Sequence, residues 1–281
     1  MKIATTIKEV RETVAQWKRE GLTVGLVPTM GYLHQGHGSL IKASANDCDR
    51  TVVSVFLNPT QFAPNEDLES YPRDFENDKA LCKEMGADLV FHPEVEEMYS
   101  EGSATFVEIL SDMPKQLCGK TRPIHFRGVC TVVSKLFNIV NPDKAFFGEK
   151  DAQQLAIIRK MVKDMSYGIE IVGCPIIREA DGLAKSSRNT YLNEEERKAA
   201  LCLSQAVEIG KDLVNKGETN ADKVISAMKS HIEKEPLARI DYVQAVNGVT
   251  MTPVDTLCKN VLVAMAVYIG KTRLIDNFSV K

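Results

Sequence analysis

The sequence lacks the features that mark a membrane protein or a general nucleic-acid binder. Its longest apolar run, Val261 to Ile269, is far shorter than the roughly 20 residues of a membrane-spanning helix, and Met1 to Val10 holds no apolar signal core. Lys and Arg number 35 against 38 Asp and Glu, so the net charge is −3, and no basic tract occurs. We therefore expect a soluble, cytoplasmic protein with no nucleic-acid or membrane partner.

The sequence also lacks the cysteine spacing of metal or redox sites and the motifs of the common nucleotide-binding loops. The seven cysteines include no CxxC pair, and an odd number cannot all form disulfides. They are typical of reduced, mostly buried thiols, and neither Cys nor His has the spacing of a structural zinc site. Neither GxxxxGK[ST] nor a helix-opening GxGxxG occurs, so the common phosphate-binding loops are excluded. These absences do not exclude a local basic site that binds a small anion.

The composition is that of a globular protein. The chain has 281 residues, of which 44% are apolar and 26% charged, and a chain of this length buries roughly 75% of its extended surface on folding. The first part of the chain alternates between strand-like and helix-like segments. We expect strands at 22–28, 51–57, 88–91, 104–110, 145–147 and 169–177, and helices at 38–48, 71–85, 126–140 and 151–165. This alternation predicts an α/β fold with a parallel sheet covered on both faces.

The pattern changes after Asn193. Helices are expected at 194–216 and 221–235, followed by strands at 240–246, 261–269 and 273–278 without crossover helices. Such a run favours a smaller α+β domain with an antiparallel sheet. We place the boundary near Ile176, which gives an N-terminal domain over 1–175 and a C-terminal domain over 176–281.

A first polar cluster follows the strand expected at 22–28, where ligands bind in parallel sheets. His34 and His37 stand three residues apart, with Gly36 between them, at the start of a helix. Backbone N–H groups and the helix dipole attract phosphate there, and glycine allows a nucleotide to approach. Both imidazoles could donate hydrogen bonds to phosphoryl oxygens. The alternative is a turn with two solvated histidines.

Two further clusters follow other strands. Asn58 and Gln61 come after the strand at 51–57, and Lys150, Asp151 and Gln154 come after the strand at 145–147. Lys150 could hold phosphate, and Asp151 could accept hydrogen bonds from ribose hydroxyls. The alternatives are a hydrogen-bonded turn for the first cluster, and a helix cap with a surface charge for the second.

A basic loop lies at the expected domain junction. Lys185, Ser186, Ser187 and Arg188 combine two cations and two hydroxyls in one short segment. Such a loop can form an oxyanion cradle and can close over a substrate. The alternative is a solvated basic loop. The other three histidines and the single tryptophan lack such a context, and we interpret them as structural: His92, His125, His231 and Trp17.

These segments together resemble one enzyme family. The motifs PTMGYLHQGH, VFLNPTQF, FFGEKDAQQ and READGLAKSSRN are similar to those of pantoate–β-alanine ligases, from about Thr23 to Asn193, with a weaker match at Leu274 to Asn277. The resemblance implies a Rossmann-like N-terminal domain, a smaller C-terminal lid domain and a homodimer. It also implies that pantoate and MgATP form pantoyl adenylate and pyrophosphate, and that β-alanine then releases pantothenate and AMP. The Mg²⁺ would be held mainly by the ATP phosphates.

The resemblance also implies roles for particular residues. His37, as proton donor, would act in catalysis with His34 and Lys150. Pantoate and β-alanine would be bound by Gln61, Gln154 and Asn58. The residues implied at the ATP site are Met30, Gly31, Tyr32, Leu33, His34, Gln35, Gly36, His37, Gly148, Glu149, Lys150, Asp151, Ile177, Lys185, Ser186, Ser187 and Arg188. Neutral glutamines suit a carboxylate nucleophile, because they orient it without neutralising its charge.

Three positions depart from the family pattern, and three alternative functions stay open. Lys185 stands where Met or Leu is common, Gly38 where Leu often follows the histidine, and Ile124 where Gly is usual. We expect Lys185 to add charge beside the phosphates and Ile124 to alter the 122–126 loop.

The alternative functions are a nucleotidyltransferase that stops after joining AMP to a phosphate-bearing acceptor, a class I aminoacyl-tRNA synthetase, and a non-catalytic ATP-binding regulator.

Overall fold

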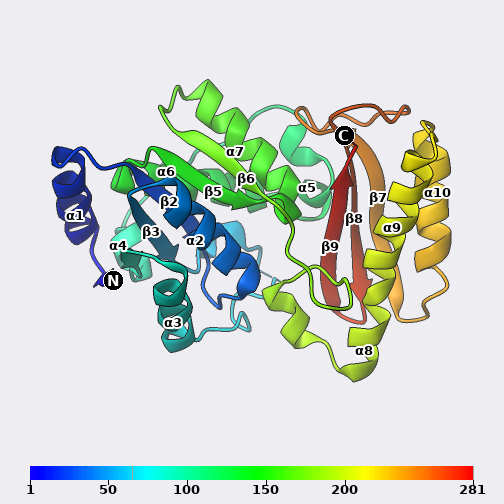
Figure 1. The fold of residues 1–281 in the computed structure, drawn as a ribbon, viewed down its shortest axis with the longest axis horizontal. Coiled ribbons are helices and arrows are strands. Elements are labelled where there is room, and N and C mark those ends of the chain that lie inside the picture. The colour runs from blue at the N-terminus through cyan, green and yellow to red at the C-terminus, as the bar shows by residue number, and fades with distance from the viewer. Residues whose placement is uncertain (65, 281) are drawn as a thin grey trace. The chain divides into compact units, whose positions relative to one another are not determined.

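The computed structural model describes residues 1–64 and 66–280, which fold into two compact units (Figure 1). Unit 1 comprises Met1–Leu110, Arg122–Glu149 and Ile157–Pro175, and unit 2 comprises Ser111–Thr121, Lys150–Ala156 and Ile176–Lys281. Two segments that precede the boundary expected from the sequence, 111–121 and 150–156, therefore pack within unit 2.

Unit 1 is built on a six-stranded parallel sheet. Its strands, in spatial order, are β1 (Lys2–Ala4), β4 (Leu89–Phe91), β3 (Arg50–Val55), β2 (Val24–Thr29), β5 (Lys144–Gly148) and β6 (Glu170–Cys174). The chain runs outward from β2 through β3 to β4, and then resumes on the other side of β2 with β5. The strand order thus reverses between β2 and β5, and this is where doubly wound sheets bind ligands.

Helices cover this sheet on two faces. Helices α2 (Gln35–Asp47) and α3 (Phe75–Met85) pack over one face, in a core that includes Val27, Val53 and Phe146. Gly25 on β2 lets α2 approach, because a Cβ there would overlap the Ser44 hydroxyl. Because side chains alternate along a strand, Val24 and Leu26 point to the other face. Helices α1 (Ile7–Arg19) and α6 (His125–Val140) cover that other face. They contact each other, and both contact β2.

Most elements expected in this part of the chain are present, but 104–110 is not a strand. Within the described residues it pairs with no other strand, and the Val107 N–H donates to the Thr131 hydroxyl of α6 at 3.0 Å. Phe106 and Leu110 are 48% and 85% exposed, so its apolar residues do not form a buried face. The short helices α4 (Val95–Met98) and α5 (Cys118–Thr121) precede α6. The parallel α/β fold predicted from the sequence is confirmed.

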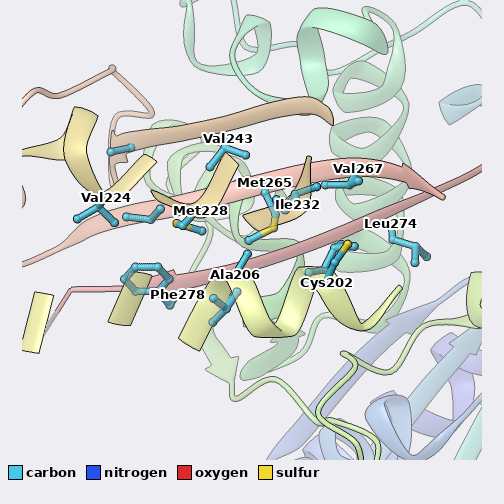
Figure 2. Close-up of a cluster of buried hydrophobic side chains, with 14 of the residues drawn as sticks. Cys202, Ala206, Val224, Met228, Ile232, Val243, Met265, Val267, Leu274 and Phe278 are labelled. Carbon is cyan, nitrogen blue, oxygen red and sulfur yellow. The ribbon is translucent and has the colours of Figure 1, made fainter. Parts of the chain in front are cut away.

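Unit 2 contains a three-stranded antiparallel sheet, as the sequence predicts. The strands are β7 (Ala238–Asn247), β8 (Val261–Ile269) and β9 (Thr272–Ser279), in that order. Helices α9 (Leu201–Asn215) and α10 (Ala221–Ile232) bury one sheet face in an apolar core (Figure 2). The segment 194–216, expected to be one helix, forms two. Helix α8 (Glu194–Ala199) ends at Ala199, and α9 begins at Leu201.

Helix α7 (Ala152–Asp164) follows β5, and its first residues belong to unit 2. Its bounds agree with the helix expected over 151–165. No helix among the described residues is long and apolar enough to cross a membrane.

Candidate active site

The turn between β2 and α2 has an unusual backbone that a buried carboxylate stabilises. Gly31 and Tyr32 both have left-handed backbones, with φ of 88° and 52°, which a tyrosine rarely adopts. The N–H groups of Tyr32 and Leu33 donate to the two carboxylate oxygens of Asp78, at 3.0 and 2.6 Å. Asp78 is 1% exposed, and burial raises the pKa of its carboxyl group. Asp78 therefore fixes the direction in which the chain enters α2.

The two histidines lie side by side at the N-terminus of α2, with ring centroids 4.2 Å apart. His34 is the N-cap residue, and its Nδ1 accepts a hydrogen bond from the Gly36 N–H at 3.0 Å. Likewise, Nδ1 of His37 accepts from the His34 N–H at 3.3 Å. An imidazole nitrogen that accepts carries no proton, so each neutral ring carries its proton on Nε2. This arrangement gives two Nε2–H donors at the positive end of a helix.

The side chain of Gln61 is oriented by its neighbours. A 3₁₀ turn, η1 (Pro59–Gln61), follows β3, with Asn58 as its N-cap residue. The Asn58 amide donates to Oε1 of Gln61 at 3.0 Å, and Nε2 of Gln61 donates to Sδ of Met30 at 3.0 Å. Oδ1 of Asn58 accepts from the Tyr99 hydroxyl at 2.8 Å. Asn58, which is 1% exposed, thus orients Gln61 from inside the protein.

The backbone of Gln61 is held by α6 and the loop before it. The Gln61 carbonyl oxygen lies 3.1 Å from Nδ1 of His125 and 3.4 Å from Nη2 of Arg122. A Cβ at Gly128 would lie 2.5 Å from the Gln61 Cα, so only glycine fits there. Ile124 has a right-handed backbone, with φ of −94°. Any residue can adopt that conformation, so the glycine usual at this position of the family is not required.

The segment after β5 crosses from unit 1 into unit 2. Gly148 ends β5 and Glu149 follows it in unit 1, whereas Lys150, the exposed Asp151 and the half-buried Gln154 lie in unit 2. The intervening Gln153 is 5% exposed. Its amide accepts from the Cys118 N–H at 3.0 Å and donates to the carbonyls of Met113 and Gln116. These bonds fix the first turn of α7 against 113–118.

The basic loop of unit 2 extends from a tight hairpin. The Lys185 N–H donates to the Ile177 carbonyl at 2.9 Å, and Arg178 bridges to Ala184 across the hairpin. Ser186 caps the 3₁₀ helix η4 (Ser187–Tyr191) by accepting from the Arg188 N–H at 3.3 Å. Nζ of Lys185 lies 2.9 Å from Oε2 of Glu179. The charge that Lys185 adds to the family pattern is therefore paired with a carboxylate of the same hairpin.

The family model described as "Pantoate-beta-alanine ligase" matches residues 2–279 of this chain. The chain belongs to the pantoate–β-alanine ligase family. Over 279 residues it is 62% identical to the pantothenate synthetase of Ruminiclostridium cellulolyticum and 56% identical to that of Enterococcus faecalis, and each match covers 99% of both chains. The resemblance and the ligase function predicted from the motifs are confirmed.

Solved structures of the family share the fold. The pantothenate synthetase of Thermus thermophilus is 42% identical, with a TM-score of 0.95 over 99% of each chain. The Francisella tularensis pantoate–β-alanine ligase, solved in complex with β-γ ATP and β-alanine, is 33% identical, with a TM-score of 0.81 over 99% of this chain and 97% of that one.

Several residues that shape this candidate site are not among those predicted from the sequence. Asp78 was part of a helix expected to be polar, although its i,i+4 spacing with the buried Cys82 places both residues on the inward face. Tyr99 and Arg122 had no local signal, because their partners lie far away in the sequence. His125, interpreted from the sequence as structural, contacts the backbone carbonyl of Gln61, which agrees with a structural role. No group of three or more His, Cys, Asp or Glu side chains among residues 1–64 and 66–280 is arranged to hold a metal ion.

Proposed function

We propose that the chain condenses pantoate with β-alanine in two steps on the residues described above. In the first step, a carboxylate oxygen of pantoate attacks the α-phosphorus of ATP. The bond from that phosphorus to the bridging oxygen breaks, and pyrophosphate leaves. In the second step, the amine of β-alanine attacks the acyl carbon of pantoyl adenylate. The bond to the phosphate oxygen breaks, AMP leaves, and the amine loses a proton.

The paired imidazoles at the start of α2 carry this proposal. Because Nδ1 of each ring accepts a backbone N–H, the Nε2–H groups of His34 and His37 are the ring donors that would meet phosphoryl oxygens. Donors of this kind stabilise negative charge as it moves to the leaving pyrophosphate. His37 would be the proton donor and His34 would assist it. The Met30–Gly36 backbone around them would line the ATP site.

Cationic side chains would bind the phosphates, and amide side chains would bind pantoate. Lys150 and Arg188 would bind the phosphates, together with Gly148, Glu149, Asp151, Ile177, Lys185, Ser186 and Ser187 at the ATP site. Gln61 and Gln154 would bind pantoate through neutral N–H donors, which leave the attacking carboxylate charged. Asn58 would act through Gln61, since its amide and carbonyl bond to Gln61 and Tyr99. Mg²⁺ would enter with ATP as part of the substrate.

Product analysis tests the reaction. Purified protein is incubated with MgATP and pantoate, with and without β-alanine, and a reaction without pantoate serves as the control. We expect AMP and pantothenate in equal amounts only when all three substrates are present. Pyrophosphate release without incorporation of β-alanine would instead support the nucleotidyltransferase alternative.

The resemblance also supports a cytoplasmic homodimer. Sedimentation analysis at several protein concentrations tests the dimer, for which we expect twice the chain mass. A mass of one chain at all concentrations would contradict it.

A further inference from the structure

Strand β9 presents two buried polar residues in succession. Asp276 and Asn277 are 1% and 6% exposed, near the C-terminal end of the strand. Successive residues of a strand point to opposite faces of its sheet. Leu274 and Phe278, which have the same parity as Asp276, lie in the core with α9 and α10 (Figure 2). Asp276 therefore points to the helix side of the sheet, and Asn277 points to the other side.

On the helix side, Asp276 holds the hairpin that precedes the basic loop. Its carboxylate accepts two hydrogen bonds from Arg178, from Nη1 at 2.7 Å and from Nη2 at 2.8 Å. Nη1 also donates to the carbonyl of Gly182 at 3.0 Å, so one guanidinium ties the first arm and the turn of the hairpin to β9. The Asn277 N–H donates to Oδ1 of Asp276 at 2.8 Å. A bidentate pair of this kind fixes orientation as well as distance.

On the opposite side, Asn277 holds the phosphate-binding segment that follows β5. Its Nδ2 donates to the backbone carbonyl of Lys150 at 2.9 Å. The two partners are 127 residues apart in the sequence. This bond fixes the peptide plane from which the Lys150 side chain extends. One short stretch of β9 therefore anchors both basic segments of unit 2.

We propose that Asp276 and Asn277 are positioning residues for the adenylation step. Asp276 acts through Arg178 on the loop that carries Lys185 to Arg188, and Asn277 acts on the backbone of Lys150. The proposal rests on the proposed function, in which these segments bind the ATP phosphates. Neither residue touches substrate in this scheme. Because reacting groups must be held in a narrow range of geometry, loss of either anchor slows the step in which pyrophosphate leaves.

The test uses two variants and a matched control in the full chain. Asn277→Ala removes the bond to the Lys150 carbonyl, and Arg178→Lys keeps the charge but loses the bidentate geometry. Thr272→Val removes a buried hydroxyl from the same strand, five residues and about 16 Å from Asn277. For each protein, ATP–pyrophosphate exchange with pantoate measures adenylation. Rapid mixing of the enzyme-bound adenylate with β-alanine measures the second step.

We expect exchange to slow about 10-fold or more in Asn277→Ala and Arg178→Lys, while the second step stays within about twofold of the parent. Thr272→Val should change neither rate beyond about twofold. Unchanged exchange in Asn277→Ala would overturn the positioning role. Equal losses in both steps would also overturn it, because they indicate a smaller folded fraction. Absence of exchange in the parent protein would refute the proposed function instead.

Discussion

Replacing Gly128 with alanine should separate the activity of this enzyme from its stability. Gly128 lies in α6, where the helix meets the turn that carries Gln61. A Cβ at this position would lie 2.5 Å from both the Gln61 Cα and the Thr60 carbonyl oxygen. Both are backbone atoms, which cannot rotate away as a side chain could.

The magnitude follows from the geometry. Ordinary contacts of a Cβ begin near 3.4 Å, so helix and turn must separate by about 1 Å. Overpacking of this kind costs about 1–3 kcal/mol of unfolding free energy. Alanine in place of glycine returns about 1 kcal/mol through its higher helix propensity. The net loss of stability is therefore about 0–2 kcal/mol.

The effect on catalysis should be larger. A displacement of about 1 Å at a substrate-binding group can lower the rate about 100-fold. Because Gln61 is proposed to bind pantoate, we expect kcat/KM for pantoate to fall by about that factor.

The assay pairs steady-state kinetics in pantoate with urea unfolding of the same preparation. Gly168→Ala is the control, since a Cβ at Gly168 would meet no atom within 4 Å. Both properties of the control should match the parent. A folded Gly128→Ala protein with kcat/KM for pantoate within about threefold of the parent would refute the reasoning. A loss of unfolding free energy well above about 3 kcal/mol would show that the added Cβ destabilises the whole fold, and does not act mainly by displacing Gln61.

Three further predictions concern single groups. His37→Ala should slow adenylation about 100-fold, measured by pyrophosphate release, whereas His231→Ala, whose imidazole bonds to Gln205 at an exposed position, should not; near-parent release by His37→Ala would remove its role. Gln154→Ala should raise KM for pantoate or lower kcat about 10-fold or more, and no change in either constant would contradict the assignment. Burial raises the pKa of Asp78, so the folded protein binds this proton more tightly than the unfolded chain. The contribution of Asp78 to stability is then full below the ordinary carboxyl pKa and declines as pH rises toward the raised value. Asp78→Asn should lack this decline when urea unfolding is measured at pH values from 3.8, the ordinary pKa of the group, upward, and identical pH profiles for parent and variant would disprove it.

Local sequence signals predicted much of this fold. Short apolar runs rich in β-branched residues located every strand of the two sheets except β1, because such signals depend on neighbouring residues. The N-terminal helix α1 was missed although its signal was present. Thr6 and Glu9 form a capping box, and its spacing can be read from the sequence. The three-residue strand β1 is too short for any periodicity to show.

The segment 104–110 shows where such signals fail. Its β-branched and apolar residues are typical of a strand, but the structure assigns no strand there. A strand also needs a neighbour for its backbone groups, and none lies beside it within the described residues. Pairing is a property of the folded chain, and local composition does not report it.

The sequence by itself determined most of the element types, the strand ends where polar residues gather and, through its motifs, the family. Only the tertiary structure decided how those residues are held. Asp78 reaches the turn before His34 across 46 residues, Asn58 reaches Gly128 across 70, and Asn277 reaches Lys150 across 127. A residue's neighbours in the sequence set its local conformation. Its long-range partners depend on strand order and on which face each side chain takes, and these are settled only when the chain packs.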